Sequence, residues 1–202
     1  NVPHTTTCPG GQAGLVASSF GISSTVTGMS YNGVALASIG AITFNTERVW
    51  GLLNPATGAE FDLVVSASGP TDLLVAVSTI CGVDQTTPNG PAVADDETTS
   101  ASPFVTSSVT VPTDGMALNA AYICDFANTS TAVTSSGGTE RANHLLDYGN
   151  GKCYHVVQTR TTTGTFSYSF DGGAITPFVA AVSIPINAAP VSARRRVTLV
   201  GP

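Results

Sequence analysis

Short runs of β-forming residues, each ended by a turn residue, recur along almost the whole chain and constrain its fold more than any other feature. Val, Ile, Thr and aromatic residues suit pleated strands, whereas Gly, Pro and Asn end them. The runs cover 14–21, 25–31, 34–40, 46–54, 60–68, 71–81, 107–112, 116–124, 152–160, 165–170 and 177–185. Helical periodicity is almost absent, which leaves no room for crossover helices. The pattern predicts an all-β fold, an antiparallel two-sheet β-sandwich of jelly-roll-like type.

Two of these runs carry more local information. Asn32-Gly33 separates the second run from the third and is the strongest two-residue signal for a β-hairpin. The run at 71–81, "TDLLVAVSTIC", is nearly all apolar, as expected of a central strand that is covered on both faces. Trp50 lies within an apolar run, where packing in the core is the simplest interpretation.

Charge is scarce and unevenly distributed. Charged residues make up 10% of the chain, against the usual ~25%. Up to Pro190, 13 acidic residues face four basic ones, a net charge of −9, and Arg194, Arg195 and Arg196 follow. We therefore predict an acidic sandwich domain over 1–188 and an Arg-rich extended arm over 189–202.

The arm is the first candidate for partner binding. Its "RVTLV" stretch alternates like a strand, so Arg194, Arg195, Arg196, Val197 and Leu199 could dock on a neighbouring subunit and extend an exposed sheet edge. A frayed terminus is the alternative. Three positive charges on an acidic body bind nucleic acid weakly, and no apolar run approaches the ~20 residues of a membrane span, so neither is an expected partner.

Four cysteines lack the C-x-x-C spacing of zinc sites. Cys81 and Cys124 end apolar runs and are expected to be buried thiols. Cys8 and Cys153 lie in more polar surroundings and are the better candidates for a disulfide if the protein is extracellular.

The segment 127–150 is polar and rich in Gly, Ser and Thr, so we expect a long excursion or interaction loop. It contains Asn128-Thr129-Ser130, which satisfies the three-residue pattern for N-glycosylation. Such a pattern also arises by chance.

The stretch 82–97, "GVDQTTPNGPAVADDE", ends the apolar run at 71–81 abruptly. Its oxygen-bearing side chains are of the kind that bind Ca²⁺, but their spacing matches no known calcium motif, and we expect a solvated loop without metal. The candidate ligands are Asp84, Asn89, Asp95, Asp96 and Glu97. We predict that Asp84 accepts a hydrogen bond from the backbone amide two residues on, that Thr86 and Thr87 do likewise more weakly, and that Pro88 fixes the exit. The strand is expected to stop because it has reached the end of the sandwich, where this turn reverses it.

No catalytic constellation stands out. His4, His144 and His155 fit surface or sheet-face positions, and neither a nucleophile elbow, a zinc-protease motif nor a P-loop is present. We expect no enzymatic activity and no cofactor.

A row of aromatic residues offers a different kind of site. Phe166, Tyr168 and Phe170 fall on one side of a strand by period-two alternation. They form either a surface face that binds carbohydrate or a face of the core, with Ser167 and Ser169 outside.

Five segments follow one another in a recognisable order: "MSYNGVALASIG", "RVWGLLNPATG", "FDLVVSASG", "VSTICGVDQTTPNG" and "FVAAVSIP". Together they resemble a widespread family of β-sandwich modules found in bacterial secreted and surface proteins and in phage structural proteins, and the likeness runs from about residue 2 to 187. The chain departs from the pattern at Gly51, where an aromatic residue is common, in the 127–150 segment and in the Arg-rich tail. The resemblance implies a sandwich fold and a virion or extracellular setting, and it implies no reaction.

Two function classes follow. The first is a non-enzymatic assembly protein, a phage capsid decoration or tail appendage subunit that packs on neighbouring copies or on another virion subunit. The alternative is an extracellular module that binds carbohydrate or a cell surface. The low charge and the basic arm favour the first.

Overall fold

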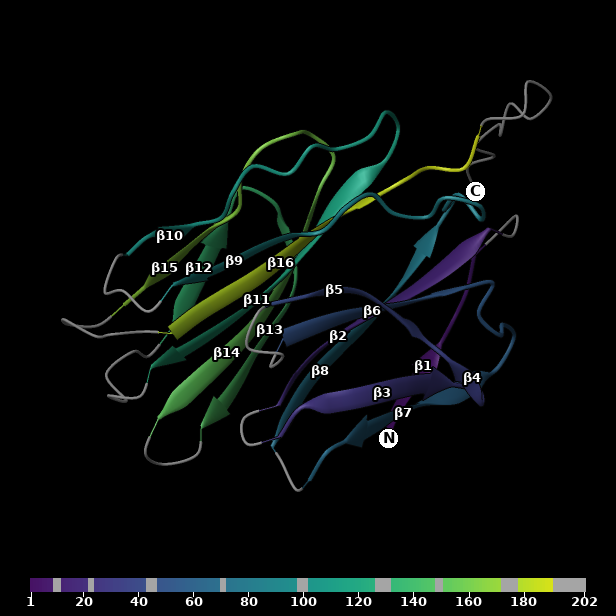
Figure 1. Cartoon of the computed structure of the whole chain (residues 1–202), viewed down its shortest axis with the longest axis horizontal. Helices are drawn as coiled ribbons and strands as arrows, with labels where there is room; N and C mark the ends of the chain where they lie inside the picture. The colour runs from purple at the N-terminus through teal and green to yellow at the C-terminus, as the bar shows by residue number, and fades with distance from the viewer. Residues whose placement is uncertain are drawn as a thin grey trace, which may run out of the picture.

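The chain is seen in a computed structural model that describes residues 1–8, 12–21, 24–42, 47–69, 72–97, 102–125, 132–147, 151–171 and 178–190. These residues form β-strands and no helix (Figure 1). The strands are β1 (Val2–Thr5), β2 (Ala13–Gly21), β3 (Val26–Tyr31), β4 (Val34–Ala35), β5 (Ala37–Ala41), β6 (Glu47–Leu53), β7 (Glu60–Ala67), β8 (Leu73–Cys81), β9 (Val93–Glu97), β10 (Phe104–Val105), β11 (Met116–Asp125), β12 (Val133–Ser136), β13 (Thr139–Asp147), β14 (Lys152–Arg160), β15 (Ser167–Phe170) and β16 (Phe178–Ile186).

The strands belong to four sheets, and their pairings are antiparallel. We call them the outer N sheet (β1-β7-β3-β4), the inner N sheet (β5-β6-β2-β8), the inner C sheet (β13-β14-β11-β16-β9) and the outer C sheet (β10-β15-β12). The predicted all-β antiparallel fold is thus confirmed. Two sheets were expected, and the described strands divide among four.

The four sheets are stacked, and three layers of buried side chains lie between them. Leu15, Trp50 and Leu63 fill the layer between the two N sheets. The two inner sheets meet over a second cluster that includes Val49, Leu118 and Val182. Ala121, Val156, Phe166 and Tyr168 belong to the third, between the two C sheets. Trp50 is therefore a core residue, as expected.

Strand alternation explains how an inner sheet can be buried on both faces. In β2, Leu15 and Ala17 point to the outer N sheet, whereas Val16 points to the inner C sheet. Every residue of β2 is buried. Because successive side chains of a strand face opposite ways, such a strand must be apolar or small at each position, which is what "AGLVASSFG" provides.

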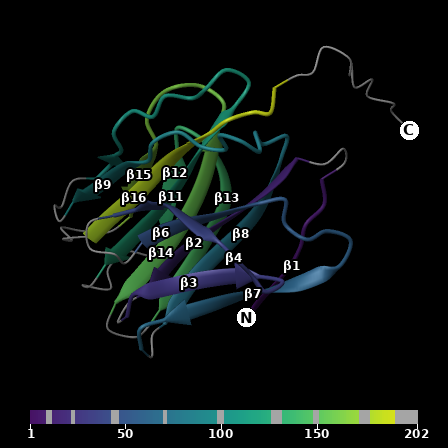
Figure 2. The same cartoon turned by 45° about the vertical axis from the view of Figure 1, so that its right-hand side comes forward.

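The two halves of the chain repeat one strand order. The order β5-β6-β2-β8 in the first half corresponds to β13-β14-β11-β16 in the second, and β1-β7-β3 corresponds to β10-β15-β12. The edge strands β5 and β13 also share an irregularity. The strand pairing of β5 shifts its register at Ile39, and that of β13 shifts at the equivalent residue, Arg141. In Figures 1 and 2 the purple-to-blue half and the green-to-yellow half lie on opposite sides of the molecule, with their inner sheets facing each other.

Three local predictions can be compared with the structure. The hairpin at Asn32-Gly33 is confirmed: Tyr31 pairs with Val34, and both turn residues have positive φ, 48° and 76°. The run at 71–81 forms β8, whose residues are mostly half-buried, and β8 lies at the edge of its sheet and not at the expected central position. The expected loop at 127–150 is wrong for residues 132–147, which form β12 and β13. Residues 127–131 and 148–150, including the glycosylation pattern at Asn128, lie outside the described residues.

Candidate functional site: the loop after β8 and the cavity beside it

The loop that follows β8 is shaped by one carboxylate. Asp84 Oδ1 accepts hydrogen bonds from the backbone amides of Thr86 (2.8 Å) and Thr87 (3.3 Å), and its Oδ2 accepts one from Thr87 Oγ1 (2.9 Å). The prediction for Asp84 is confirmed. These bonds, the one from the Thr86 amide above all, lower the pKa of Asp84 from its ordinary value, because they stabilise the charged form.

The same loop connects the two halves of the chain and is fastened to the segment after β16. The Asp84 amide donates to the Asn187 carbonyl (3.0 Å), and the Asn187 amide donates to the Pro88 carbonyl (2.8 Å). The Ala189 amide donates to the Gly82 carbonyl (2.7 Å). The strand β8 ends at Cys81, and the loop after it carries the chain from the inner N sheet to β9 of the inner C sheet.

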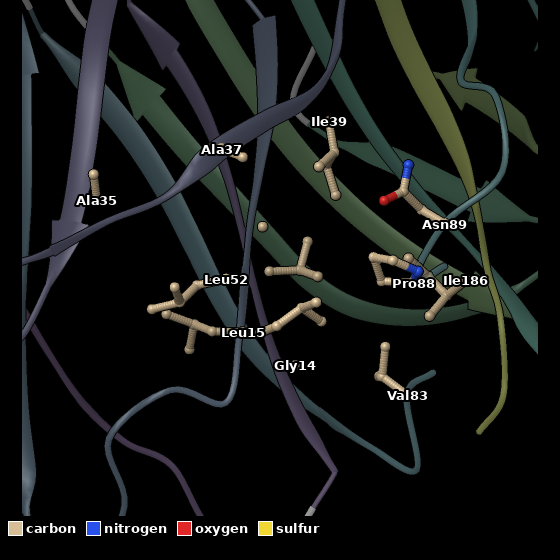
Figure 3. Close-up of a pocket in the computed structure, with 13 residues that line it drawn as sticks. Gly14, Leu15, Ala35, Ala37, Ile39, Leu52, Val83, Pro88, Asn89 and Ile186 are labelled. Carbon is tan, nitrogen blue, oxygen red and sulfur yellow. The ribbon is translucent and has the colours of Figure 1, made fainter. Parts of the chain in front are cut away.

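A cavity of about 370 Å³ lies between this loop and the inner N sheet (Figure 3). Side chains of Ile39, Val83 and Ile186 form part of its wall, and among the described residues of its lining Asn89 alone carries an amide side chain. Its volume lies at the lower end of the roughly 300–1,000 Å³ typical of ligand pockets. The lining is well suited to aliphatic groups.

Glycines shape the floor of this apolar cavity. A Cβ on Gly14 would lie 3.1 Å from Val83 Cγ2, and one on Gly51 would lie 3.1 Å from Ile39 Cδ1. Both contacts are tight, so glycine lets the loop and the edge strand approach the sheet closely.

A second cavity, of about 290 Å³, occupies the corresponding place in the second half. With the register shifts of β5 and β13 aligned, Gly14 corresponds to Met116, Gly51 to Thr159 and Ile39 to Arg141. The second member of each pair lines the second cavity. There the Arg141 Nε donates to Thr159 Oγ1 (2.8 Å). The repeated fold thus carries an apolar cavity and, at the equivalent position, a cavity of mixed lining that includes an arginine.

The histidines are dispersed over three strands. His4 on β1 contacts Thr79 Oγ1 through Nε2 (2.9 Å), and its partial burial lowers its pKa. His144 on β13 is exposed, whereas its pairing partner His155 on β14 is fully buried.

The acidic stretch forms no metal cluster among the residues that the structure describes. Asp95 instead accepts from the Ser107 amide (3.0 Å) and hydroxyl (2.6 Å). The side chains of Asp96 and Glu97 lie outside the described part, and Asp84 is occupied within its own turn.

The aromatic residues considered as a carbohydrate face belong to the core. Phe166 and Tyr168 have no exposed area, and Phe170 packs against the same cluster. Tyr168 also donates its hydroxyl to Asn119 Oδ1. The surface interpretation is wrong because the outer C sheet turns this face toward the inner C sheet, and Ser169 is on the exposed side.

The cysteines pair differently from the expectation. Cys8 is bonded to Cys81, with 5.4 Å between their Cα atoms, and Cys124 is bonded to Cys153. A bond between Cys8 and Cys153 would have to join the two halves, whereas each observed bond lies within one half. Cys124 and Cys153 stand opposite each other on β11 and β14, a non-local pairing that sequence spacing does not disclose.

The predicted arm residues Arg194, Arg195, Arg196, Val197 and Leu199 lie outside the described residues. The described chain ends at Pro190, directly after the segment that holds the loop. The cavity itself was not foreseen. Its only trace in the sequence is a glycine at positions 14 and 51, inside strand runs where glycine marks a close approach.

Comparison with known proteins identifies no relative: no family model, no curated protein and no solved structure matches the chain. Among the described residues, none forms a helix able to cross a membrane.

Proposed function

We propose that this protein is a non-enzymatic assembly protein, a phage virion surface subunit such as a capsid decoration or tail appendage protein that packs on neighbouring copies of itself. One observation carries the proposal: a body with a net charge of −9 is followed immediately by an arm with three arginines. Opposite charges on one chain favour binding between the arm of one copy and the body of another.

Two structural features support this proposal. The described chain ends at an exposed Pro190, and its yellow end lies at the margin of the sheets in both views (Figures 1 and 2). Two disulfides, one in each half, suit an extracellular or virion-surface location, where thiols are oxidised.

For the fold, we propose the jelly-roll-like sandwich at the level of each half. Each half contributes one inner and one outer sheet that pack face to face over their own cluster of apolar side chains. The alternative function, carbohydrate binding, depended on Phe166, Tyr168 and Phe170, and their burial removes the observation that favoured it.

The charge of the arm provides the test. Substituting Arg194→Ser, Arg195→Ser and Arg196→Ser together should weaken self-association, measured by light scattering at low salt. Added salt should weaken the wild-type association in the same way, because exposed charges are screened within a Debye length of about 8–10 Å near physiological ionic strength. Equal association by the triple variant and the wild type would contradict the proposal.

A further inference from the structure

An edge strand forms part of the wall of the apolar cavity. Ala37 and Ile39 of β5 contribute to its wall, and β5 is the last strand of the inner N sheet, with no described strand paired to its outer side. An unpaired strand edge beside an apolar cavity can accept an extended segment, with backbone pairing on the edge and side chains in the cavity.

The chain itself contains a segment of the required kind. In the stretch "VTLV" at 197–200, Val197 and Leu199 fall on one side of an extended segment because side chains alternate. Three arginines precede this stretch. The body that would receive it has the opposite charge, −9.

The end of the described chain leaves an arm long enough to reach another copy. Ile186 lines the cavity, Ala188 forms a β-bridge with Val83 in its wall, and the described chain ends two residues later at an exposed Pro190. Figure 2 shows this yellow end leaving the sheets outward. Twelve residues follow, and an extended chain of that length reaches about 40 Å, enough to meet a second molecule.

We infer that the apolar cavity formed by Gly14, Ile39, Gly51, Val83 and Ile186 is the receptor for Val197 and Leu199 of a neighbouring copy. This inference rests on the proposed assembly function and names the site at which assembly occurs. The second cavity has Arg141 and Thr159 in the equivalent places, so its lining carries a positive charge that does not suit a segment preceded by arginines.

Two full-length variants separate the receptor from its ligand. Ala37→Trp places a large side chain at the exposed edge of the cavity, and Val197→Asp with Leu199→Asp makes the arm polar. Each variant alone should lose self-association by about tenfold or more, because truncating central apolar contacts has that effect at interfaces. A mixture of the two should form a one-to-one complex, because one supplies an intact arm and the other an intact cavity.

The repeated fold provides a matched control. Thr139 on β13 corresponds to Ala37 on β5 and is also exposed. Thr139→Trp should therefore associate like the wild type, and thermal unfolding should show that both tryptophan variants fold.

A synthetic peptide of residues 191–202 gives a second readout. It should bind the arm variant, as measured by fluorescence anisotropy, and should bind the same variant carrying Ala37→Trp about tenfold or more weakly. Undiminished peptide binding after Ala37→Trp would overturn the inference.

The outcomes distinguish the inference from the function on which it rests. If the wild type associates and Ala37→Trp associates equally well, the cavity is not the receptor, although the assembly function stands. If each variant fails alone and the mixture also fails, docking between copies is overturned. If the wild type does not associate at all, the proposed function itself is wrong.

Discussion

Asp84 shows how one side chain can fix a connection between two halves of a protein. Its carboxylate holds the amides of Thr86 and Thr87, while its own amide is bonded to Asn187. The backbone of the turn therefore stays free to bond the segment that follows β16, at Asn187. Loss of the carboxylate should loosen both the turn and this attachment.

Replacing Asp84 with Ala should lower the thermal stability in a pH-dependent manner. The folded pKa of Asp84 lies below its ordinary value of 3.8, so the carboxylate stabilises the fold above pH 3.8. That contribution is lost as the pH falls through the lowered, folded-state pKa. The melting temperatures of the wild type and the variant should thus differ at pH 6 and converge in strong acid. A difference that stays constant across this range would contradict the assignment, and Asp84→Asn should retain part of the effect.

Gly33 provides a second residue-scale prediction, with a control in the adjoining strand. Gly33 has φ of 76° and open space around a Cβ, so Gly33→Ala should destabilise through backbone conformation alone, by about 1–2 kcal/mol. Gly28, on β3, also has open space but no positive φ, so Gly28→Ala should be nearly neutral. Denaturant unfolding of both variants measures the difference. Equal effects would show that the turn conformation is not the cause.

At the scale of elements, a strand could be recognised from the sequence when most of its residues are buried. The runs that became β2, β11 and β16 are buried and therefore rich in apolar or small residues, which makes them visible. The strand β13, "TERANHLLD", lies at a sheet edge and is mostly exposed. An edge strand with polar side chains shows no clear alternation, and its segment was therefore mistaken for a loop.

Within the candidate site, the turn at Asp84 could be predicted from the sequence, whereas the cavity and the disulfide pairing could not. The turn at Asp84 depends on residues two and three positions away, so local sequence sufficed. The cavity depends on contacts between Gly14, Gly51 and the loop after β8, and the disulfides depend on strand register. Such pairings are set by the tertiary fold, which one sequence does not reveal.

At the scale of the whole molecule, the two repeated halves are joined through a shared core. The inner sheets meet over a cluster of aliphatic side chains drawn from both halves, among them Val16 and Leu118 at corresponding positions. Phe20 and Tyr122, which also correspond, stack across the same interface with an angle of 11° between their rings. Neither half can expose its inner sheet without losing this burial.

The shared core predicts that both halves unfold together. Thermal unfolding followed by calorimetry should show one cooperative transition, and Leu118→Ala should destabilise the whole protein by about 2–5 kcal/mol, as for other large-to-small core changes. Val64, which is 40% exposed on β7, offers a control whose change to Ala should have little effect. Two separate transitions, with Leu118→Ala shifting only one, would show that the halves are independent.

Sedimentation velocity over a range of protein concentrations tests the central claim, assembly through the arm, most directly. The full-length chain should form a defined oligomer whose population grows with concentration, whereas a chain truncated after Pro190 should remain a monomer. A full-length chain that sediments as a monomer at every concentration would contradict the assembly function. So would a truncated chain that forms the same oligomer as the full-length one, because the arm would then have no part in it.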